Sequence, residues 1–309
     1  MNQLRQPTIL ILFFFLLFAS CEKSIEITDP SFDPMLVIVS NIAPYYTNTP
    51  DDNRIRVEIS ESQEPANNND FSYPNDVRVF LSKRNVEDRE ELKKAQSVNY
   101  FSSQKDFAVQ DEKYSIQVVA QGYDTITAET YIPQASGVKD YKILDFSKDP
   151  SIKNDEKINI SYNVEFKLDH QANVEYYHIA FFNEYFDDDP ATVDSDLWWV
   201  LVPEYADDAR YTPHFEYGIL LKKEDFTNDH VFSFKINDFI FSHEKVQNHW
   251  IEVRSVTEEY YLYHESLSRQ KLVRQDPFAE PVIIFNNIKN GLGNFSGYNS
   301  DIKGLPQPE

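Results

Sequence analysis

The chain has a single cysteine, Cys21, among its 309 residues. Without a second cysteine no intramolecular disulfide can form, so we expect packing and hydrogen bonding to stabilise the fold. Positive charge is also scarce, since 29 Lys and Arg residues stand against 51 Asp and Glu, a formal net charge of −22. Proteins that bind nucleic acids depend on Lys and Arg to neutralise phosphates, so nucleic acid is not an expected partner.

Short catalytic motifs are missing as well. The sequence contains no H-E-x-x-H, no G-x-S-x-G, no phosphate-binding loop that ends in Lys-Ser/Thr, and no C-x-x-C pair. Its histidines show no metal-ligand spacing and are expected to be structural or exposed: His170, His178, His214, His230, His243, His249 and His264. We therefore predict no cofactor, no metal centre and no enzymatic activity.

The first twenty residues have the three parts of a secretory signal. A polar start with Arg5 precedes an apolar run from Ile9 to Phe18, and two small residues then lead to Cys21. The run is about half as long as a membrane-spanning helix requires. We interpret residues 1–20 as a lipoprotein signal peptide, Cys21 as the lipidated residue, and 21–34 as a tether. An uncleaved anchor and a coincidental cysteine are the alternatives.

The mature chain would carry 28 basic and 51 acidic residues, because cleavage after position 20 removes only Arg5 among the charges. Acidic chains can be disordered, but 41% hydrophobic and 15% aromatic residues are too many for a chain that lacks a core. Apolar residues alternate with polar ones in several short runs between residues 35 and 133. Five or more such runs, separated by turn-rich stretches, predict an immunoglobulin-like β-sandwich over 35–133.

A second domain is predicted over 138–309, because the stretch PQASG at 133–137 contains the proline and glycine typical of a domain boundary. Its clearest strand is 158–168, where six large apolar residues alternate with polar ones. One amphipathic helix is predicted near 257–273, with Thr257 as its cap and with Tyr260, Tyr263 and Leu267 on its buried face. The predicted fold class is all-β and mostly antiparallel, with one helix near the C-terminus.

Two features between residues 185 and 208 resemble binding sites. Several carboxylates there, Asp187, Asp189, Asp194 and Asp196 among them, are the hard oxygen ligands that calcium prefers, but they lack the order of an EF-hand loop. We expect a solvated acidic loop, with calcium as the alternative. Trp198 and Trp199 are a candidate stacking platform for a sugar or an aromatic ligand. Adjacent strand residues point to opposite faces, so only one of them is expected to be exposed.

The C-terminal stretch 286–298 contains three of the seven glycines of the chain. No helix signal follows it, so a dinucleotide-binding loop is not predicted. Instead we expect Gly291 and Gly293 to form turns that require positive φ. We expect a strand at 282–285 that returns to the core of the second domain, with Ile288, Leu292 and Phe295 continuing the burial. The segment is predicted to close the structure rather than to bind a ligand.

Four sequence segments carry a resemblance to a known family: CEKSIEI (21–27), MLVIVSNI (35–42), VEYYHIAFF (174–182) and, above all, VIIFNNIKNGLGNFSGY (282–298). The chain resembles a family of Bacteroidota outer-membrane lipoproteins, domain of unknown function 4249 (DUF4249). A glycine usual before the helix in that family has no counterpart in 226–234. The resemblance implies a lipid-anchored outer-membrane protein, on the periplasmic or the surface side, often encoded beside TonB-dependent receptors. It supplies no catalytic residue.

These observations favour a binding or accessory lipoprotein that helps a TonB-dependent transporter or a surface complex to capture a ligand. The lipid signal, the missing catalytic motifs and the β-rich modules support this hypothesis. The alternatives are an adhesion or envelope-structural protein, which rests on the same modules, and a glycan hydrolase whose paired carboxylates leave no sequence motif.

The lipidation hypothesis makes a direct prediction for Cys21→Ala. Acyl chains contribute about 0.8 kcal/mol per buried methylene, whereas the acidic fold alone has no affinity for an anionic surface. The variant should therefore leave the detergent-extracted membrane fraction and appear in a soluble or unprocessed pool, as measured by fractionation and immunoblotting. Membrane retention after removal of the signal peptide would contradict lipidation.

Overall fold

The computed structural model describes residues 33–44, 55–63, 72–83, 89–94, 100–103, 109–150, 157–187, 197–204, 210–226, 230–241, 244–274 and 278–305. These residues form eighteen strands, one short 3-10 helix (Lys223–Asp225) and one α-helix, α2. They belong to a unit that extends from Pro34 to Glu309. None of the helices among them is long and apolar enough to cross a membrane. The predicted signal peptide, Cys21 and residues 21–32 of the tether lie outside the described residues.

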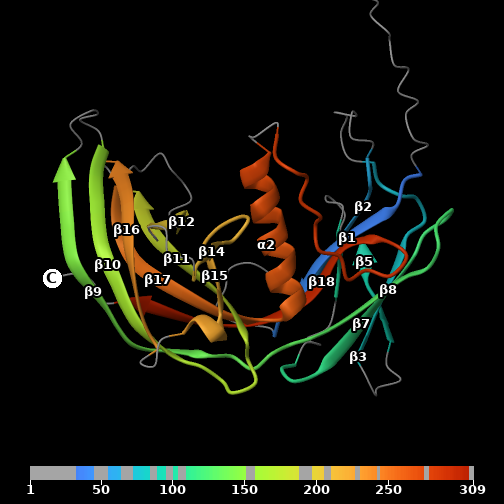
Figure 1. Ribbon diagram of the computed structural model, residues 1–309, viewed down its shortest axis with the longest axis horizontal. Coiled ribbons are helices and arrows are strands. Elements are labelled where there is room, and N and C mark those ends of the chain that lie inside the picture. Colours follow the sequence, from blue (N-terminus) through green and yellow to red (C-terminus); the bar gives the residue numbers. More distant parts are fainter. Residues whose placement is uncertain are drawn as a thin grey trace, which may run out of the picture. The chain divides into compact units, whose positions relative to one another are not determined.

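The largest sheet contains ten strands (Figure 1). Nine of them follow the order β14-β15-β11-β17-β18-β1-β2-β6-β5, and β12 pairs with β11 beside that path. Their bounds are β14 (Thr212–Pro213), β15 (Ile219–Lys222), β11 (Tyr176–Asp187), β17 (Glu244–Val256), β18 (Leu292–Leu305), β1 (Leu36–Ile42), β2 (Arg56–Glu61), β6 (Tyr100–Ser102), β5 (Lys93–Lys94) and β12 (Leu197–Leu201).

Two four-stranded sheets accompany the long one. The first contains β4 (Arg89–Glu91), β3 (Arg78–Lys83), β7 (Lys113–Val119) and β8 (Ile126–Tyr131). The second contains β13 (Pro203–Glu204), β16 (Val231–Phe241), β10 (Lys157–Asp169) and β9 (Gly137–Pro150). Among the described strands only β1 and β18 pair in parallel. The predicted all-β, mostly antiparallel class is confirmed, whereas the immunoglobulin-like topology stays a prediction.

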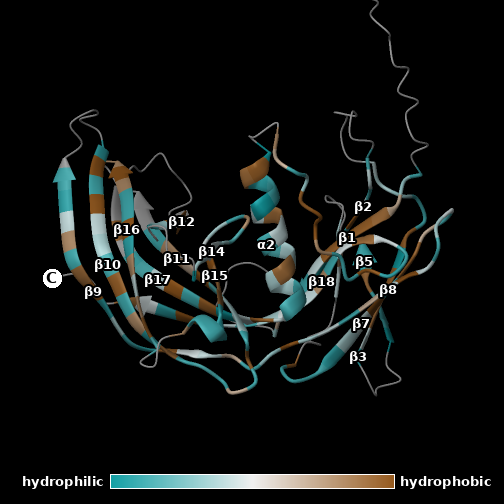
Figure 2. Cartoon of the chain, viewed as in Figure 1, coloured by the Kyte–Doolittle hydropathy of each residue, from teal (hydrophilic) through white to brown (hydrophobic). Residues whose placement is uncertain are grey.

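Each small sheet encloses a core against the long sheet. Along β10 buried and exposed residues alternate as the sequence predicted, and Figure 2 shows the same alternation as bands of opposite hydropathy. Phe166 of β10 packs against Phe232 and Phe234 of β16, with ring centroids 5.5 and 6.1 Å apart. A second core gathers Ile38, Val57, Ile116 and other residues from the N-terminal strands.

Strand β18 joins the two cores. It pairs with β1 on one side and with β17 on the other. Its odd-numbered residues share one face of the sheet, where Phe295 belongs to the N-terminal core and Leu305 to the other. Between them, Asn299 donates to the carbonyl oxygen of Pro133 at 3.0 Å, and Asp301 accepts from the amide of Val138 at 2.9 Å. The stretch 133–138, which the sequence marks as a boundary, therefore lies along this strand.

The C-terminal segment differs from the prediction in three ways. Residues 282–285 form no strand, and the side chain of Ile283 is 92% exposed, because β18 fills the place beside β1. Ile288 and Phe295 are buried in the N-terminal core rather than in the core of the C-terminal half, and Leu292 is 36% exposed. Gly293 has the predicted positive φ, at +114°, but Gly291 does not. At Gly291 an added Cβ would lie 3.0 Å from the carbonyl oxygen of Leu36, so close approach is what favours glycine there.

Helix α2 spans Glu258–Val273, close to the predicted range. The side chain of Thr257 accepts a hydrogen bond from the amide of Tyr260, which confirms the predicted cap. The predicted amphipathic face is wrong in detail, because Leu267 is only half-buried while Ser266 and Ser268 are buried. The buried side of the helix is mainly aromatic and polar, so hydrogen bonds contribute to its docking.

The role of β18 as a joint predicts that Gly293→Ala destabilises the protein more than Gly122→Ala does. Both glycines have positive φ, which costs a residue with a Cβ about 1 kcal/mol or more. At Gly122 nothing lies within 4 Å of an added Cβ, whereas at Gly293 the Cβ would overlap the carbonyl oxygen of Ile38. Thermal unfolding of both variants measures the difference; equal melting temperatures would contradict this account of the joint.

Candidate functional site

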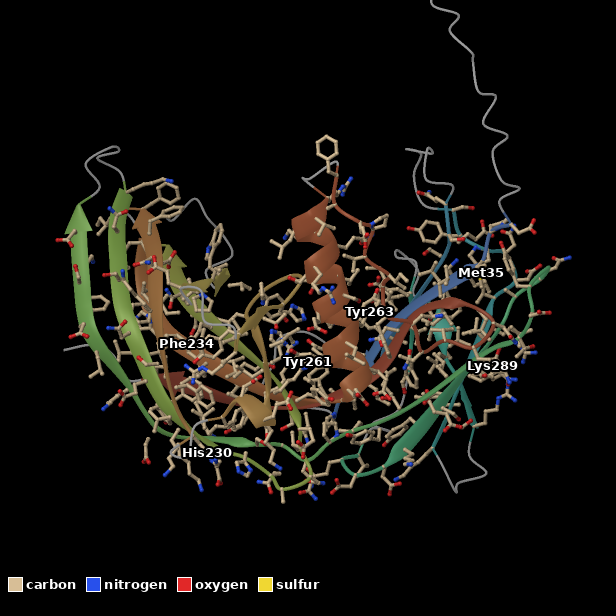
Figure 3. All side chains as sticks on the ribbon, viewed as in Figure 1. Met35, His230, Phe234, Tyr261, Tyr263 and Lys289 are labelled. Carbon is tan, nitrogen blue, oxygen red and sulfur yellow. The ribbon has the colours of Figure 1, made fainter. Side chains whose placement is uncertain are left out.

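Three histidines from distant parts of the sequence meet beneath α2. His178 lies on β11, His214 lies between β14 and β15, and His264 lies on α2. All three are buried around Tyr260, which is 1% exposed. We call these residues, with Arg254 and Glu252 of β17, the buried histidine network. It lies where α2 packs on the long sheet; Tyr261 and Tyr263 on the same helix are labelled in Figure 3.

Hydrogen-bond geometry assigns one proton to each of two imidazoles. His214 Nδ1 accepts from the backbone amides of Glu216 and Tyr217 at 3.1 and 3.3 Å, so its proton is on Nε2, which lies 3.2 Å from the Tyr260 hydroxyl. His178 Nε2 lies 2.8 Å from the carbonyl oxygen of Tyr217, so it carries the proton and donates. Its Nδ1 then accepts from the Tyr260 hydroxyl at 3.0 Å. Both rings are therefore neutral in this arrangement.

A permanent charge pair borders the network. Arg254 donates to both oxygens of Glu252, at 2.8 and 2.9 Å, and its Nη1 lies 3.4 Å from the Tyr260 hydroxyl oxygen. The side chains of the pair are 15% and 6% exposed, respectively. The guanidinium also lies 4.8 Å from the ring centroid of Tyr298. A buried pair of this kind depends on the further contacts that each partner makes, because desolvation opposes the attraction.

Burial and the nearby cation keep the network uncharged apart from the pair. Burial lowers the pKa of His178 and of His214 far below the usual range, and Arg254 lowers both further. The same two causes lower the pKa of His264 to about 3. Burial raises the pKa of Tyr260 far above its usual range. Burial would lower the pKa of Arg254, but Glu252 and three tyrosines outweigh it and raise that pKa.

The three imidazoles form a stack. The rings of His178 and His214 lie 4.1 Å apart and are inclined by 5°, and those of His214 and His264 lie 4.0 Å apart and are inclined by 28°. Stacked rings do not direct their lone pairs to one point, and no three His, Cys, Asp or Glu side chains of the described residues are placed so that they could hold a metal ion together. Within the described part of the chain, neither nitrogen of His264 has a hydrogen-bond partner.

Gly218 permits the close packing at His178. This residue has a φ of +76°, and an added Cβ would lie 2.8 Å from His178 Nε2 and would also overlap the backbone of Ile179. Only glycine tolerates both conditions. The loop between β14 and β15 can therefore lie directly on β11 and present the carbonyl oxygen of Tyr217 to His178.

A smaller polar group is buried in the core between β10 and β11. His249 Nδ1 lies 2.7 Å from Asn183 Oδ1 and 3.1 Å from the Tyr162 hydroxyl, while Asn183 donates to Asp238 at 3.0 Å. Burial lowers the pKa of His249 to about 4 and raises the pKa of Tyr162 far above its usual range. These side chains link strands from both sheets of this sandwich.

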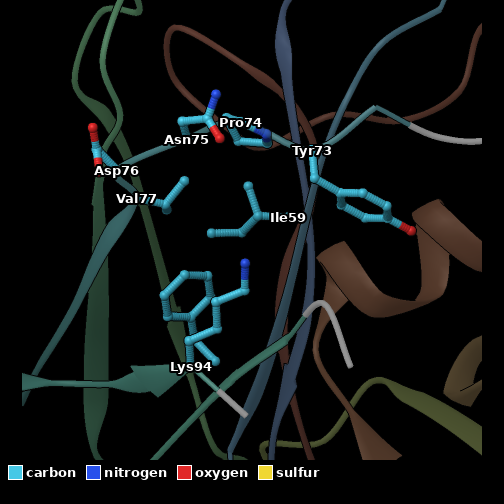
Figure 4. Close-up of a pocket in the computed structure, with 8 residues that line it drawn as sticks. Ile59, Tyr73, Pro74, Asn75, Asp76, Val77 and Lys94 are labelled. Carbon is cyan, nitrogen blue, oxygen red and sulfur yellow. The ribbon is translucent and has the colours of Figure 1, made fainter. Parts of the chain in front are cut away.

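The N-terminal half has a surface pocket of about 250 Å³ (Figure 4). Ile59 and Phe101, which already belong to the core, form part of its lining, while Asn75 and Lys94 add polar groups. The remaining lining residues are Tyr73, Pro74, Asp76 and Val77. The pocket can accommodate a small, partly apolar group.

The residues singled out from the sequence do not gather at the buried histidine network. Trp199 on β12 is 54% exposed, while the side chain of Trp198 lies outside the described residues. Asp187 ends β11, but its side chain is not described, and the other candidate calcium ligands, Asp189, Asp194 and Asp196, are outside the described residues. Gly291, Gly293 and Phe295 lie at the joint formed by β18.

Sequence reasoning missed the network because its members lie far apart in the chain. Tyr260 was assigned to the buried face of the helix, but no local spacing connects it to His178 or His214. One signal was present in the sequence: His178 occupies an apolar strand, YYHIAFF, where a buried polar residue requires partners.

These observations define a β-rich protein in which two small sheets and one helix pack on a single long sheet. A family model described as a domain of unknown function (DUF4249) matches residues 22–303. The chain belongs to this family, as the resemblance predicted. No match was found among curated proteins.

The network predicts that the protein loses stability below about pH 6.5. Because the folded-state pKa of each buried histidine is depressed, the unfolded chain binds protons first, and stability is lost as the pH falls toward the folded-state pKa. Each histidine contributes about 1.4 kcal/mol per pH unit in that interval. Urea unfolding at pH 7.5 and at pH 5.5 measures the loss.

His264→Phe is the matched variant for this experiment. It retains an aromatic ring beside His214 and removes no hydrogen bond seen among the described residues. We expect undiminished stability at pH 7.5 and a smaller acid-induced loss, by about 1.4 kcal/mol per pH unit. An unchanged pH dependence would show that His264 is not buried and neutral.

Proposed function

We propose that this chain is a lipid-anchored accessory protein of the outer membrane, with a non-enzymatic role in a TonB-dependent transport or surface complex. The signal-like N-terminus and Cys21 support the anchor, and the resemblance described above supports the envelope setting. The observation that carries the proposal is the joint at β18. It connects two sandwiches through one sheet, so that loops and faces of both keep a fixed arrangement for recognition.

The use of the ionisable side chains supports a binding role. His178, Tyr260 and Arg254 contact one another beneath α2. Burial accounts for the perturbed pKa values of His178 and Tyr260, and the neighbouring Glu252 accounts for the raised pKa of Arg254. Perturbed pKa values can mark a catalytic site, but a structural network produces them as well. Here the network fixes a helix to a sheet, which is what a rigid recognition module requires.

The test is co-purification after crosslinking in cells, with an affinity tag on the C-terminus. We expect the wild-type protein to bring down a TonB-dependent receptor, and Cys21→Ala to lose that partner because it is no longer held at the membrane. His264→Phe is the control and should retain the partner. Recovery of the wild-type protein without any such receptor would refute the accessory role.

A further inference from the structure

Large apolar side chains are unusually exposed in the last turn of α2 and in the segment that follows it. Phe278 is 94% exposed, Ile283 is 92% exposed and Leu272 is 67% exposed. Phe278 and Ile283 are the two most exposed large apolar residues of the described part of the chain, and they are five positions apart in the sequence. Scattered exposed apolar residues are ordinary, but a group at one end of an element marks an interaction site.

A hydrogen bond ties α2 to the segment that follows it. The amide of Phe285 donates to Ser266 Oγ at 3.0 Å, so the returning chain lies beside the helix at that level. Leu272 is six residues further along the helix, about 9 Å beyond this tie at 1.5 Å per residue. Phe278 and Ile283 belong to the connection between Leu272 and Phe285. All three thus belong to the stretch of chain between the two residues of this tie, Ser266 and Phe285.

Basic residues accompany these apolar ones. Arg269, Lys271 and Arg274 are exposed on the last turns of α2, and Glu280 is the acidic residue described in the following segment. We call Leu272, Phe278 and Ile283, with these three basic residues, the end patch. Its positive charge contrasts with the net charge of −22 of the whole chain. At physiological ionic strength charges are screened over about 8 Å. A surface close to the patch is therefore attracted by these basic residues more strongly than it is repelled by carboxylates elsewhere on the chain.

We infer that the end patch contacts the surface of the membrane to which the chain is anchored, with the apolar side chains in the interface and the basic ones against anionic headgroups. Exposed apolar residues beside Lys and Arg are the chemistry of interfacial binding. Basic residues near an anionic surface strengthen such binding. The inference rests on the proposed lipid anchor, and it adds which part of the fold faces the bilayer.

The length of the tether is compatible with this orientation. The thirteen residues from Cys21 to the one before Pro34 span at most roughly 45 Å when extended.

Vesicle flotation of the mature chain carrying Cys21→Ala tests the contact without the lipid. The probe is a vesicle of phosphatidylethanolamine and phosphatidylglycerol, compared with phosphatidylcholine alone. We expect partial flotation with the anionic vesicles and a loss of about tenfold or more in the combined variant Leu272→Ser, Phe278→Ser and Ile283→Ser. Arg269→Gln, Lys271→Gln and Arg274→Gln together should weaken binding to the anionic vesicles only.

A matched control uses apolar residues exposed elsewhere. Val202 and Val231 are 69% and 45% exposed, and Val202→Ser with Val231→Ser should float like the parent protein. Absence of flotation, or an equal loss in this control, would overturn the inference. So would a photoreactive residue at position 278 that crosslinks in cells to protein and not to lipid. A lipidated protein that fractionates with membranes as predicted, but fails these tests, would refute the end patch alone and leave the anchor intact.

Discussion

The close approach of β18 to β1 is the contact on which the rest of this structure depends. Gly293 lies against the carbonyl oxygen of Ile38 in a conformation that other residues rarely adopt, and the parallel ladder between the two strands comprises six residue pairs. On its other edge β18 pairs with β17 over eight residue pairs. The long sheet therefore passes from one core to the other through a single strand. If this strand were displaced, β1 and β17 would each lose a neighbour.

The buried histidine network follows from the same sheet. Thr257 accepts from the amide of Gly297 at 3.3 Å, so α2 begins directly above β18. The helix then brings Tyr260 to the face of β11 and β17 that carries His178 and Arg254. In this setting neutral imidazoles act as hydrogen-bonding spacers between a sheet and a helix. Their dependence on neutrality makes this contact sensitive to acid.

Period-two patterns predicted most of the strands, and a cap signal predicted the helix. Val164 and Phe166 alternate with polar residues because β10 buries one face, and such a pattern is legible in a single sequence. Strand β18 was missed because glycine, asparagine and serine occupy half of its positions, and its side chains meet linkers and turns rather than one apolar core. The run at 282–285 is apolar enough to form a strand, but a strand also needs a free edge with which to pair. β18 occupies the place beside β1, so the predicted strand does not form there. The network was beyond prediction because its partners meet only in three dimensions.

The position of β18 at the end of the chain has a consequence for how the protein acquires its fold. Chains emerge from their N-terminus first, and β1 must wait for a partner that lies about 255 residues later in the sequence, as the pair Val37 and Leu292 shows. Contacts this distant slow folding because a large loop must close before they form. Until β18 arrives, β1 exposes an edge that can pair with other chains. The long sheet can therefore be completed only after β18 has emerged, and a variant that lacks this strand would leave the edges of both β1 and β17 open to aggregation.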